Sequence, residues 1–565
     1  MIRLTELKLP LDHSPDDLSA LVFKTLGVAP GDVNQHTVFK RSYDARKAEL
    51  LVVYIVDVAL TSPLLEQATL ERHAGNQHIF PAPDMGYRPA VQAPVNLALR
   101  PVNDRLQPVV VGFGPCGIFA ALMLAQMGFK PIVLERGKKV RERTKDTWGL
   151  WRKNQLNPES NVQFGEGGAG TFSDGKLWSQ IKDPRFLGRK VMQEFVKAGA
   201  PEDIMIESHP HIGTFKLVKV VENMREQIIA LGGEIRFEQR VTDVLLENSP
   251  ADAQGRTHQI RALKVLDVAA GASYELRANQ VVMALGHSSR DTFAMLHERG
   301  VFMEAKPFSI GFRIEHPQGL IDRARWGRHA GHPLLGAAEY KLVHHVEKGL
   351  GAGRSVYSFC MCPGGTVVAA TSEPGRVVTN GMSQYSRNER NANAGIVVGI
   401  DPRDYPLIEG VAQHPLAGIV LQRQLESNAY VLGGSTYEAP GQLVGDFLAG
   451  ATSASLGEVI PSYKPGVKLG NLSGALPDYA IAAIREAIPV FGKKIKGFDM
   501  ADAVLTGVET RTSSPLKITR GDDFQSLNVA GMYPAGEGAS YAGGILSAGV
   551  DGIRVAEAVA KALMA

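Results

Sequence analysis

The sequence predicts an α/β fold in which a Rossmann-like domain is interleaved with a mixed-sheet domain and preceded by a small α+β domain. Residues 109–137 run from an apolar, β-forming segment through three glycines into an apolar helix and a second strand. Residues 527–560 repeat the order of strand, glycine-rich turn and long helix near the end of the chain. Between them, residues 301–500 alternate short strands with loops.

The composition is that of a globular protein. At 565 residues the chain has room for several domain-sized units of about 150 residues each. The net charge of +3 comes from acidic and basic residues mixed along the chain, so charge gives no argument for binding nucleic acid or an anionic membrane. With three cysteines and no apolar signal segment at the N-terminus, we expect a reduced, cytoplasmic setting.

Residues 1–88 are expected to form the small α+β domain. LTELKLPL is typical of a strand, and Ser14 can cap a following helix that carries Asp16 and Asp17 in its first turn. HTVFKRSYDA and AELLVVYIVDVAL have the pattern of a strand pair. Residues 89–106 are rich in proline and poor in pattern, which predicts a linker.

The segment 109–137 has the features of a dinucleotide-binding βαβ unit. Gly112 allows the tight turn out of the strand, Gly114 lets backbone approach a pyrophosphate, and Gly117 lets helix and strand pack closely. The N-terminus of the helix offers free N–H groups to the phosphates. Glu135, at the end of the second strand, is placed to bind a ribose hydroxyl. The predicted site residues in this unit are Gly112, Gly114, Pro115, Cys116, Gly117 and Glu135.

The same stretch permits a second interpretation. No charged residue occurs from Val109 to Phe129, a length sufficient to span a bilayer. Against this, the glycines cluster at the start of the stretch, Pro115 interrupts it, and Lys130-Pro131 ends it. The pattern therefore favours a strand followed by a helix over a membrane span.

Glycine-rich backbone recurs within 107–300, which we predict to be the first part of the dinucleotide-binding domain. Residues 161–177 hold too many glycines for a helix interior, which suggests backbone brought close to a ligand, with a plain flexible loop as the alternative. A substrate domain is expected at 301–500, and the C-terminal part of the dinucleotide-binding domain at 501–565. The residues predicted to contact the ligand in the first part are Gly165, Gly167, Gly168, Gly170 and Gly286.

The dispersal of these partners favours FAD over NAD. A classical NAD domain carries its fingerprint within a compact set of parallel strands. Here Gly286 follows a later strand, and the PAGEGASYAGGI segment lies near the C-terminus. The arrangement resembles the two-domain FAD-binding fold of glutathione reductase and p-hydroxybenzoate hydroxylase, in which FAD lies extended across the domain.

This resemblance implies roles for the predicted site residues. The fingerprint glycines would hold the pyrophosphate and Glu135 the adenosine ribose, with Arg136 near the adenine and Val241 as a backbone contact to it. Gly536 and Glu537 stand where the fold usually has Gly-Asp, so Glu537 would reach the ribitol or a phosphate. Three residues would cap the final helix, whose positive end stabilises charge on the reduced flavin: Gly543, Gly544 and Ile545.

More specifically, the whole chain resembles a bacterial family of uncharacterised FAD-dependent dehydrogenases. The resemblance is carried by FGEGGAGTFSDGKL, PHIGTFKL, FSIGFRIEHPQ, FCMCPGG, ETRTSSP and YPAGEGASYAGGILSAGVDG, and it covers essentially all 565 residues. It implies FAD as the cofactor and no assigned substrate.

Three groups are candidates for chemistry. Cys360 and Cys362 would face the same side of a regular strand about 6.6 to 6.8 Å apart, near the upper limit for a disulfide. This favours structural or cavity-lining thiols over redox chemistry, and a metal site that adds His344 and His345 matches no standard spacing. Arg511 could bind an anionic substrate, neutralise the negative charge of the flavin, or form an ion pair between domains. We therefore leave the catalytic residue open and predict no metal ligand.

The sequence thus predicts an FAD-binding oxidoreductase that transfers a hydride or electrons through the flavin to an unidentified small molecule. A flavin-dependent monooxygenase and a flavin-stabilised, non-catalytic protein that binds a partner are the alternatives. GLGAGR at 349–354 has no strand leading into it and a strand after it, so it reads as a hairpin turn. Hence no dedicated NAD(P)H domain is expected, and any NAD(P)H binds transiently. We predict no nucleic-acid or membrane partner and leave the oligomeric state open.

Overall fold

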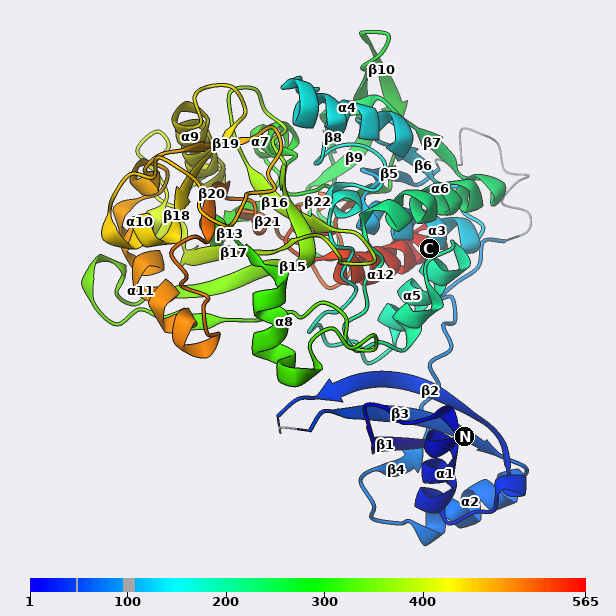
Figure 1. Cartoon of the computed structure of the whole chain (residues 1–565). Helices are drawn as coiled ribbons and strands as arrows, with labels where there is room; N and C mark the ends of the chain where they lie inside the picture. Colours follow the sequence, from blue (N-terminus) through cyan, green and yellow to red (C-terminus); the bar gives the residue numbers. More distant parts are fainter. Residues whose placement is uncertain (47–48, 95–106, 565) are drawn as a thin grey trace.

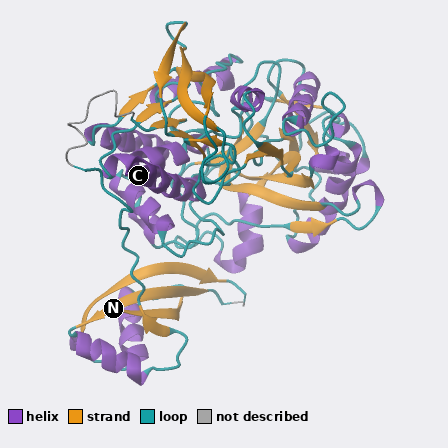
Figure 2. Cartoon of the chain, turned by 180° about the vertical axis from the view of Figure 1, so that it is seen from behind, coloured by secondary structure: helices purple, strands orange, loops and turns teal. Residues whose placement is uncertain are grey.

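The computed structural model describes residues 1–46, 49–94 and 107–564 and has the predicted α/β class (Figure 1). A small N-terminal domain lies below a larger body in this view. Most of the predicted linker, residues 95–106, lies outside the described residues. The view from behind shows the strands of the larger body between helices on its outer sides (Figure 2).

The N-terminal domain is a four-stranded antiparallel sheet with two helices packed against it. Ser14 caps the first helix as predicted: its side chain accepts a hydrogen bond from the backbone N–H of Asp17, and the Asp17 carboxylate accepts one from the Ser14 N–H. The elements are β1 (Ile2–Pro10), α1 (Pro15–Leu26), β2 (Val33–Asp44), β3 (Leu51–Leu60), α2 (Pro63–Arg72) and β4 (Ile79–Pro81), with the strands in the order β2-β3-β1-β4.

A five-stranded parallel sheet forms the centre of the dinucleotide-binding part. Its strands are β5 (Val109–Val111), β6 (Ile132–Leu134), β7 (Glu234–Arg236), β11 (Val281–Met283) and β23 (Met532–Pro534), in the order β23-β11-β5-β6-β7. Strand β11 pairs with β5 on one side and with β23 on the other. Because all strands are parallel, their carboxyl ends meet at one edge, and the two glycine-rich segments of the sequence lie together there.

Helices cover one face of this sheet. The helices are α3 (Pro115–Gln126), α5 (Leu187–Lys197), α6 (Thr214–Ala230) and α12 (Ile545–Met564), while α4 (Val140–Lys153) contacts α6 and places Leu150 in the apolar core around Phe312 and Ile396. Helix α12 packs closely on α3, since a Cβ on Gly552 would lie only 2.4 Å from the carbonyl oxygen of Cys116. The uncharged stretch 109–129 is thus a strand, a turn and a 12-residue helix, and the membrane interpretation is wrong. Within the described part of the chain, no helix is long and apolar enough to cross a membrane.

The predicted β-meander covers the other face of the parallel sheet. Apolar residues of its strands, such as Val241 and Ile260, share a buried cluster with Val109 and Leu134. The strands are β8 (Gln239–Asn248), β9 (His258–Asp267) and β10 (Ala272–Arg277), and β22 (Val529–Ala530) pairs with β9 in the same sheet. Along the chain, β11 and then α7 (Arg290–Glu298) follow β10.

An eight-stranded mixed sheet forms the second part of the larger body. It is antiparallel except for the β18–β19 pair. Strand β20, which follows residue 500, also belongs to it because it pairs with β13. The strands are β13 (Phe308–Pro317), β14 (Val343–His345), β15 (Ser355–Ala369), β16 (Thr379–Ser383), β17 (Asn391–Ile400), β18 (Ala439–Leu443), β19 (Val467–Leu469) and β20 (Val504–Glu509).

Four helices pack around the mixed sheet, and a short strand pair links it to the dinucleotide-binding part. The helices are α8 (Gln318–Trp326), α9 (Ala417–Leu432), α10 (Val444–Ala449) and α11 (Asp478–Lys494), and the pair is β12 (Met303–Ala305) with β21 (Leu516–Ile518). The chain therefore crosses between the two parts at 306–307 and again at 510–515, so the parts are interleaved.

Candidate functional site

A cavity of about 1190 Å³ lies between the carboxyl edge of the parallel sheet and the mixed sheet. It exceeds the range of about 300–1,000 Å³ typical of small-molecule sites, so it has room for a dinucleotide and a second molecule. The predicted site residues that line it are Gly112, Gly114, Pro115, Cys116, Glu135, Arg136, Gly168, Gly170, Val241, Gly286, Glu537, Gly543, Gly544 and Ile545. Gly117, Gly165, Gly167 and Gly536 stand behind the wall.

The fingerprint turn is held by close backbone packing. Gly112 has a φ of 98°, and a Cβ on it would lie 2.5 Å from the carbonyl oxygen of Ala284. A Cβ on Gly117 would lie 1.9 Å from the carbonyl oxygen of Gly112. This close contact explains why position 117, which faces the strand and not the cavity, is a glycine. Gly114 is the N-cap of α3, so the free N–H groups of that helix border the cavity.

Glu135 lies at the predicted place but has a second task. One of its oxygens accepts a hydrogen bond from the backbone N–H of Phe113 at 2.8 Å. The other accepts from the N–H groups of Gly137 and Gly165, both at 2.9 Å. The buried carboxylate therefore ties together the fingerprint turn and the glycine-rich loop, in addition to facing the cavity.

The glycine-rich loop 161–177 is held by a side chain that the sequence did not single out. The fully buried guanidinium of Arg143 donates to the carbonyl oxygens of Asn161, Val162 and Glu166, each at 2.7 Å. Burial lowers the pKa of Arg143 to about 10. The loop glycines are needed for close approach: a Cβ on Gly165 would lie 2.4 Å from Arg143 Cδ.

Two further loop glycines border the fingerprint and α6. A Cβ on Gly168 would lie 2.8 Å from the Cα of Gly114, so the loop and the fingerprint turn touch through backbone. A Cβ on Gly167 would lie 2.0 Å from the hydroxyl of Thr171. The loop is thus packed against the fingerprint turn, which is the close approach that its composition suggested.

Arg136 and Val241 line the end of the cavity nearest β6 and β8. The Arg136 guanidinium lies 4.1 Å above the ring of Phe164 and forms ion pairs of 2.9 Å with Glu159 and Asp291. Stacking and pairing fix the side chain, so it presents a rigid wall at this end.

The C-terminal segment lines the cavity beside the fingerprint. Gly536 packs on Cys116, since a Cβ on it would lie 2.9 Å from Cys116 Cβ, and its N–H donates to Asp551 at 2.8 Å. The Glu537 carboxylate points into the cavity with an oxygen 3.2 Å from Nδ1 of His287. Gly543 and Gly544 precede α12, whose N-terminus therefore borders the same space.

His287 was missed by sequence reasoning, although it directly follows the predicted Gly286. Its side chain is nearly buried, and neither ring nitrogen has a hydrogen-bond partner among the described residues, because the approach to Glu537 lacks hydrogen-bond geometry. Buried polar atoms are rarely left unpaired. This unpartnered imidazole, on the cavity wall, marks a place for polar groups of a ligand.

The far end of the cavity is a polar wall of the mixed sheet. Glu509 on β20 accepts a hydrogen bond from Arg313 Nε at 2.8 Å, and both side chains are buried. Burial raises the pKa of the Glu509 carboxyl to about 7, although the Arg313 charge opposes the shift. Cys360 and Tyr357 on β15 line the same wall.

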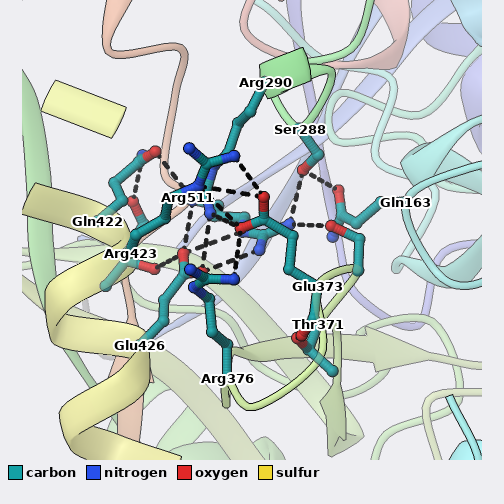
Figure 3. A network of polar contacts seen from close by, with 12 residues as sticks. Gln163, Ser288, Arg290, Thr371, Glu373, Arg376, Gln422, Arg423, Glu426 and Arg511 are labelled. Carbon is teal, nitrogen blue, oxygen red and sulfur yellow. Dashed lines mark hydrogen bonds and ion pairs between the residues drawn. The ribbon is translucent and has the colours of Figure 1, made fainter. Parts of the chain in front are cut away.

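Arg511 belongs to a buried ion network between the two parts (Figure 3). It forms two hydrogen bonds of 3.1 and 3.0 Å to the carboxylate of Glu426 on α9 and further bonds to Ser288 and Ser372. Arg290 on α7 binds the same carboxylate from the dinucleotide-binding part. Of the three roles considered for Arg511, the structure shows the ion pair between the parts, and Arg511 also lines the cavity.

The two histidines considered as metal ligands have other partners. His344 binds Glu486 at 2.8 Å and His345 binds the Ser355 hydroxyl at 2.9 Å. Neither pairs with a cysteine, and the described residues contain no cluster of three or more His, Cys, Asp and Glu side chains able to hold a metal ion.

The residues present fit FAD. The glycine turn and the N-terminus of α3 provide a backbone cradle for a pyrophosphate. The N-terminus of α12 borders the middle of the cavity, where it would stabilise negative charge. His287 and Glu537 offer polar groups between these two helix ends.

Comparison with known proteins agrees with this assignment. Residues 307–512 match a family model described as "FAD-dependent protein, C-terminal domain-like", and residues 1–59 match a domain of unknown function. An "uncharacterized protein" of Clostridium beijerinckii is 45% identical over 557 residues, which are 98% of this chain and 98% of that protein.

Two solved structures are more distantly similar. A geranylgeranyl bacteriochlorophyll reductase-like protein of Thermoplasma acidophilum is 11% identical with a TM-score of 0.34, covering 81% of this chain and 78% of that one. A glycerol-3-phosphate dehydrogenase of Bacillus halodurans, complexed with FAD, is 13% identical with a TM-score of 0.26. That match covers 59% of this chain and 53% of the dehydrogenase, so the chain spans about half the length of that enzyme. Neither similarity, at these TM-scores, supports an inference about function.

The relative from Clostridium matches almost from end to end, and the family model covers the mixed sheet that closes the cavity. The cavity itself holds the glycine cradle and the two helix N-termini suited to the phosphates of an extended dinucleotide, and the imidazole of His287 lies on its wall. The chain therefore belongs to one family with the protein of Clostridium beijerinckii, its residues 307–512 match the model of FAD-dependent proteins, and FAD is its cofactor.

Proposed function

We propose that the protein is an oxidoreductase that transfers a hydride or electrons between its FAD and a small organic molecule bound beneath the mixed sheet. The observation that carries the proposal is that one cavity is lined by Gly114 of the fingerprint and also by Glu509 and Cys360 of the mixed sheet. Bound FAD supplies the hydride or electron transfer, and the protein supplies orientation and charge.

We propose Glu509 as the group that holds or accepts a proton beside the bound molecule. General acid–base groups are most effective when their pKa lies near the working pH, and the pKa of Glu509 is about 7. Arg313 binds one carboxylate oxygen, which fixes the orientation of the group. The carboxyl can therefore exchange a proton near neutral pH without moving.

Reduced nicotinamide, where it is the electron donor, is proposed to bind transiently in the same cavity. GLGAGR forms the short helix η7 (Gly349–Gly351) and the turn that joins the antiparallel strands β14 and β15. This is the predicted hairpin turn and not a second nucleotide fingerprint, which supports binding of NAD(P)H without a domain of its own.

The test is anaerobic mixing of the FAD-loaded protein with NADH and, separately, NADPH while the flavin absorbance is followed, with oxygen admitted afterwards. Bleaching followed by slow reoxidation is expected for a dehydrogenase or reductase. Fast reoxidation with a hydroxylated product would identify a monooxygenase instead. Purified protein that lacks flavin absorbance and binds no added FAD would overturn the proposal.

A further inference from the structure

Cys360 and Cys362 lie on a distorted part of β15. The pairing register of β15 with β17 shifts between Phe359 and Cys362, and Cys360 has a φ of 41°. This bulge breaks the regular alternation of side chains on which the expected separation of about 6.6 to 6.8 Å was based. The Cys362 thiol donates to the Cys360 carbonyl oxygen at 3.4 Å, so it lies against the backbone of the residue whose own thiol lines the cavity.

The two thiols have different surroundings. Cys360 is partly exposed to the cavity, whereas Cys362 is fully buried behind it. The neighbouring Cys362 thiol lowers the pKa of Cys360, and the nearby charges of Arg313 and Lys176 lower it further, although burial opposes the shift. The same interaction and burial raise the pKa of Cys362. Cys360 is therefore the more acidic thiol of the two, and Cys362 is the one that keeps its proton more tightly.

The third cysteine provides a contrast within the same cavity. Cys116 also lines the wall, but burial raises the pKa of its thiol well above the ordinary value, and Asp551 adds to the shift. It has no cysteine neighbour. Of the three cysteines, Cys360 is therefore the one whose pKa is lowered.

Cys360 shares its wall with the proposed acid–base group. Arg313 donates to the carbonyl oxygen of Cys360 at 2.9 Å and to the carboxylate of Glu509 at 2.8 Å. The thiolate charge contributes to the raised pKa of Glu509. One guanidinium thus organises a thiolate, a proton-exchanging carboxyl and the cavity space between them and the N-terminus of α12.

We propose that Cys360 and Cys362 form a redox pair that exchanges two electrons with the FAD, an inference that rests on the proposed function. An S–S bond forms between the Cys360 thiolate and the Cys362 sulfur while the S–H bond of Cys362 breaks. One proton and two electrons leave the pair, and FAD takes up all three, giving the reduced flavin anion. In the reverse direction the reduced flavin returns the dithiol. Disulfide formation by a low-pKa thiolate and a neighbouring thiol needs no other oxidant.

Reductive titration of the full-length, FAD-loaded protein tests the pair. After air oxidation, anaerobic addition of dithionite is expected to consume four electrons per bound FAD, two for the flavin and two for the disulfide. Cys360→Ser and Cys362→Ser are each expected to consume two. Ser355→Ala, on the same strand but outside the cavity lining, is the control and is expected to consume four per bound FAD.

Peptide mapping of the same oxidised sample gives an independent measurement. After alkylation of free thiols, mass spectrometry is expected to find the Cys360–Cys362 disulfide, and dithionite reduction should convert both cysteines to the alkylated form. Uptake of two electrons by the wild-type protein, with both cysteines alkylated after air oxidation, would overturn the redox pair while leaving the proposed function intact. Failure of the protein to bind FAD would instead overturn the proposed function.

Discussion

Arg511 and Glu426 form a two-point ion pair in the protein interior, with hydrogen bonds of 3.1 and 3.0 Å and almost no exposed side-chain surface. The second face of the same carboxylate is bound by Arg290. The three residues come from three segments: the chain after β20, helix α9 and helix α7. Their charges therefore hold the mixed sheet against the dinucleotide-binding part, directly behind the cavity.

Glu426→Gln is expected to destabilise the protein strongly. The substitution keeps the shape of the side chain but leaves Arg290 and Arg511 buried with insufficient negative charge. Breaking a buried pair in this way costs about 3–5 kcal/mol. Urea unfolding of the FAD-loaded protein measures the loss. The control is Glu275→Gln, which removes an exposed pair with Arg261 and should leave the unfolding free energy nearly unchanged.

Glu509→Gln is expected to weaken the dependence of stability on pH. Because the folded-state pKa is raised from its ordinary value of 4.5 to about 7, the folded protein holds the proton more tightly than the unfolded chain. The stabilising contribution is complete below pH 4.5 and is lost as the pH rises towards 7. Between pH 5.5 and 8, the free energy of unfolding of the wild type should therefore fall by about 2 kcal/mol more than that of the variant. Equal losses in parallel unfolding experiments would contradict the assigned pKa.

The parts of the site that sequence could predict are those made by contiguous residues. The strand, turn and helix around Gly112 and Gly114 depend on local backbone requirements, so the pattern alone locates them. The C-terminal segment was predictable because it repeats the same strand–turn–helix order. The family resemblance then joined the two halves into an FAD site.

The parts that sequence could not predict depend on pairing between distant segments. The bulge at Cys360 follows from the register of β15 against β17, which no local pattern encodes. Arg143 lies in an unremarkable basic helix, and its role appears only when loop 161–177 folds over it. The contact between His287 and Glu537 joins residues 250 positions apart, although both neighbour a predicted glycine.

Glu135→Gln is expected to separate the structural role of this residue from its predicted contact with ribose. The carboxylate accepts three backbone hydrogen bonds, and an amide nitrogen placed at either oxygen position cannot accept. Leaving a buried N–H without an acceptor costs about 1–3 kcal/mol. Thermal unfolding of the FAD-free protein should show this loss. A loss seen only with FAD present would mean that the carboxylate acts through the cofactor alone.

Gly114→Ala and Gly117→Ala are expected to impair different properties, the first FAD binding and the second the stability of the fold. A Cβ on Gly114 would meet its nearest neighbour, the Cα of Gly168, at an ordinary 3.6 Å, so the fold should lose only about 1 kcal/mol, the cost of alanine at an N-cap. That Cβ would, however, occupy space on the cavity wall where the pyrophosphate is expected, and FAD should bind about tenfold more weakly for each 1.4 kcal/mol of lost contact.

Gly117→Ala places its Cβ 1.9 Å from a backbone carbonyl oxygen, which forces α3 away from β5. Overpacking of this kind costs about 1–3 kcal/mol even before FAD is added. Fluorescence titration with FAD and unfolding of the FAD-free protein therefore rank the two variants in opposite order. Gly114→Ala is impaired mainly in FAD binding, and Gly117→Ala mainly in folding. If both variants lost stability equally without FAD, Gly114 would be a packing residue like Gly117 and not part of the cofactor cradle.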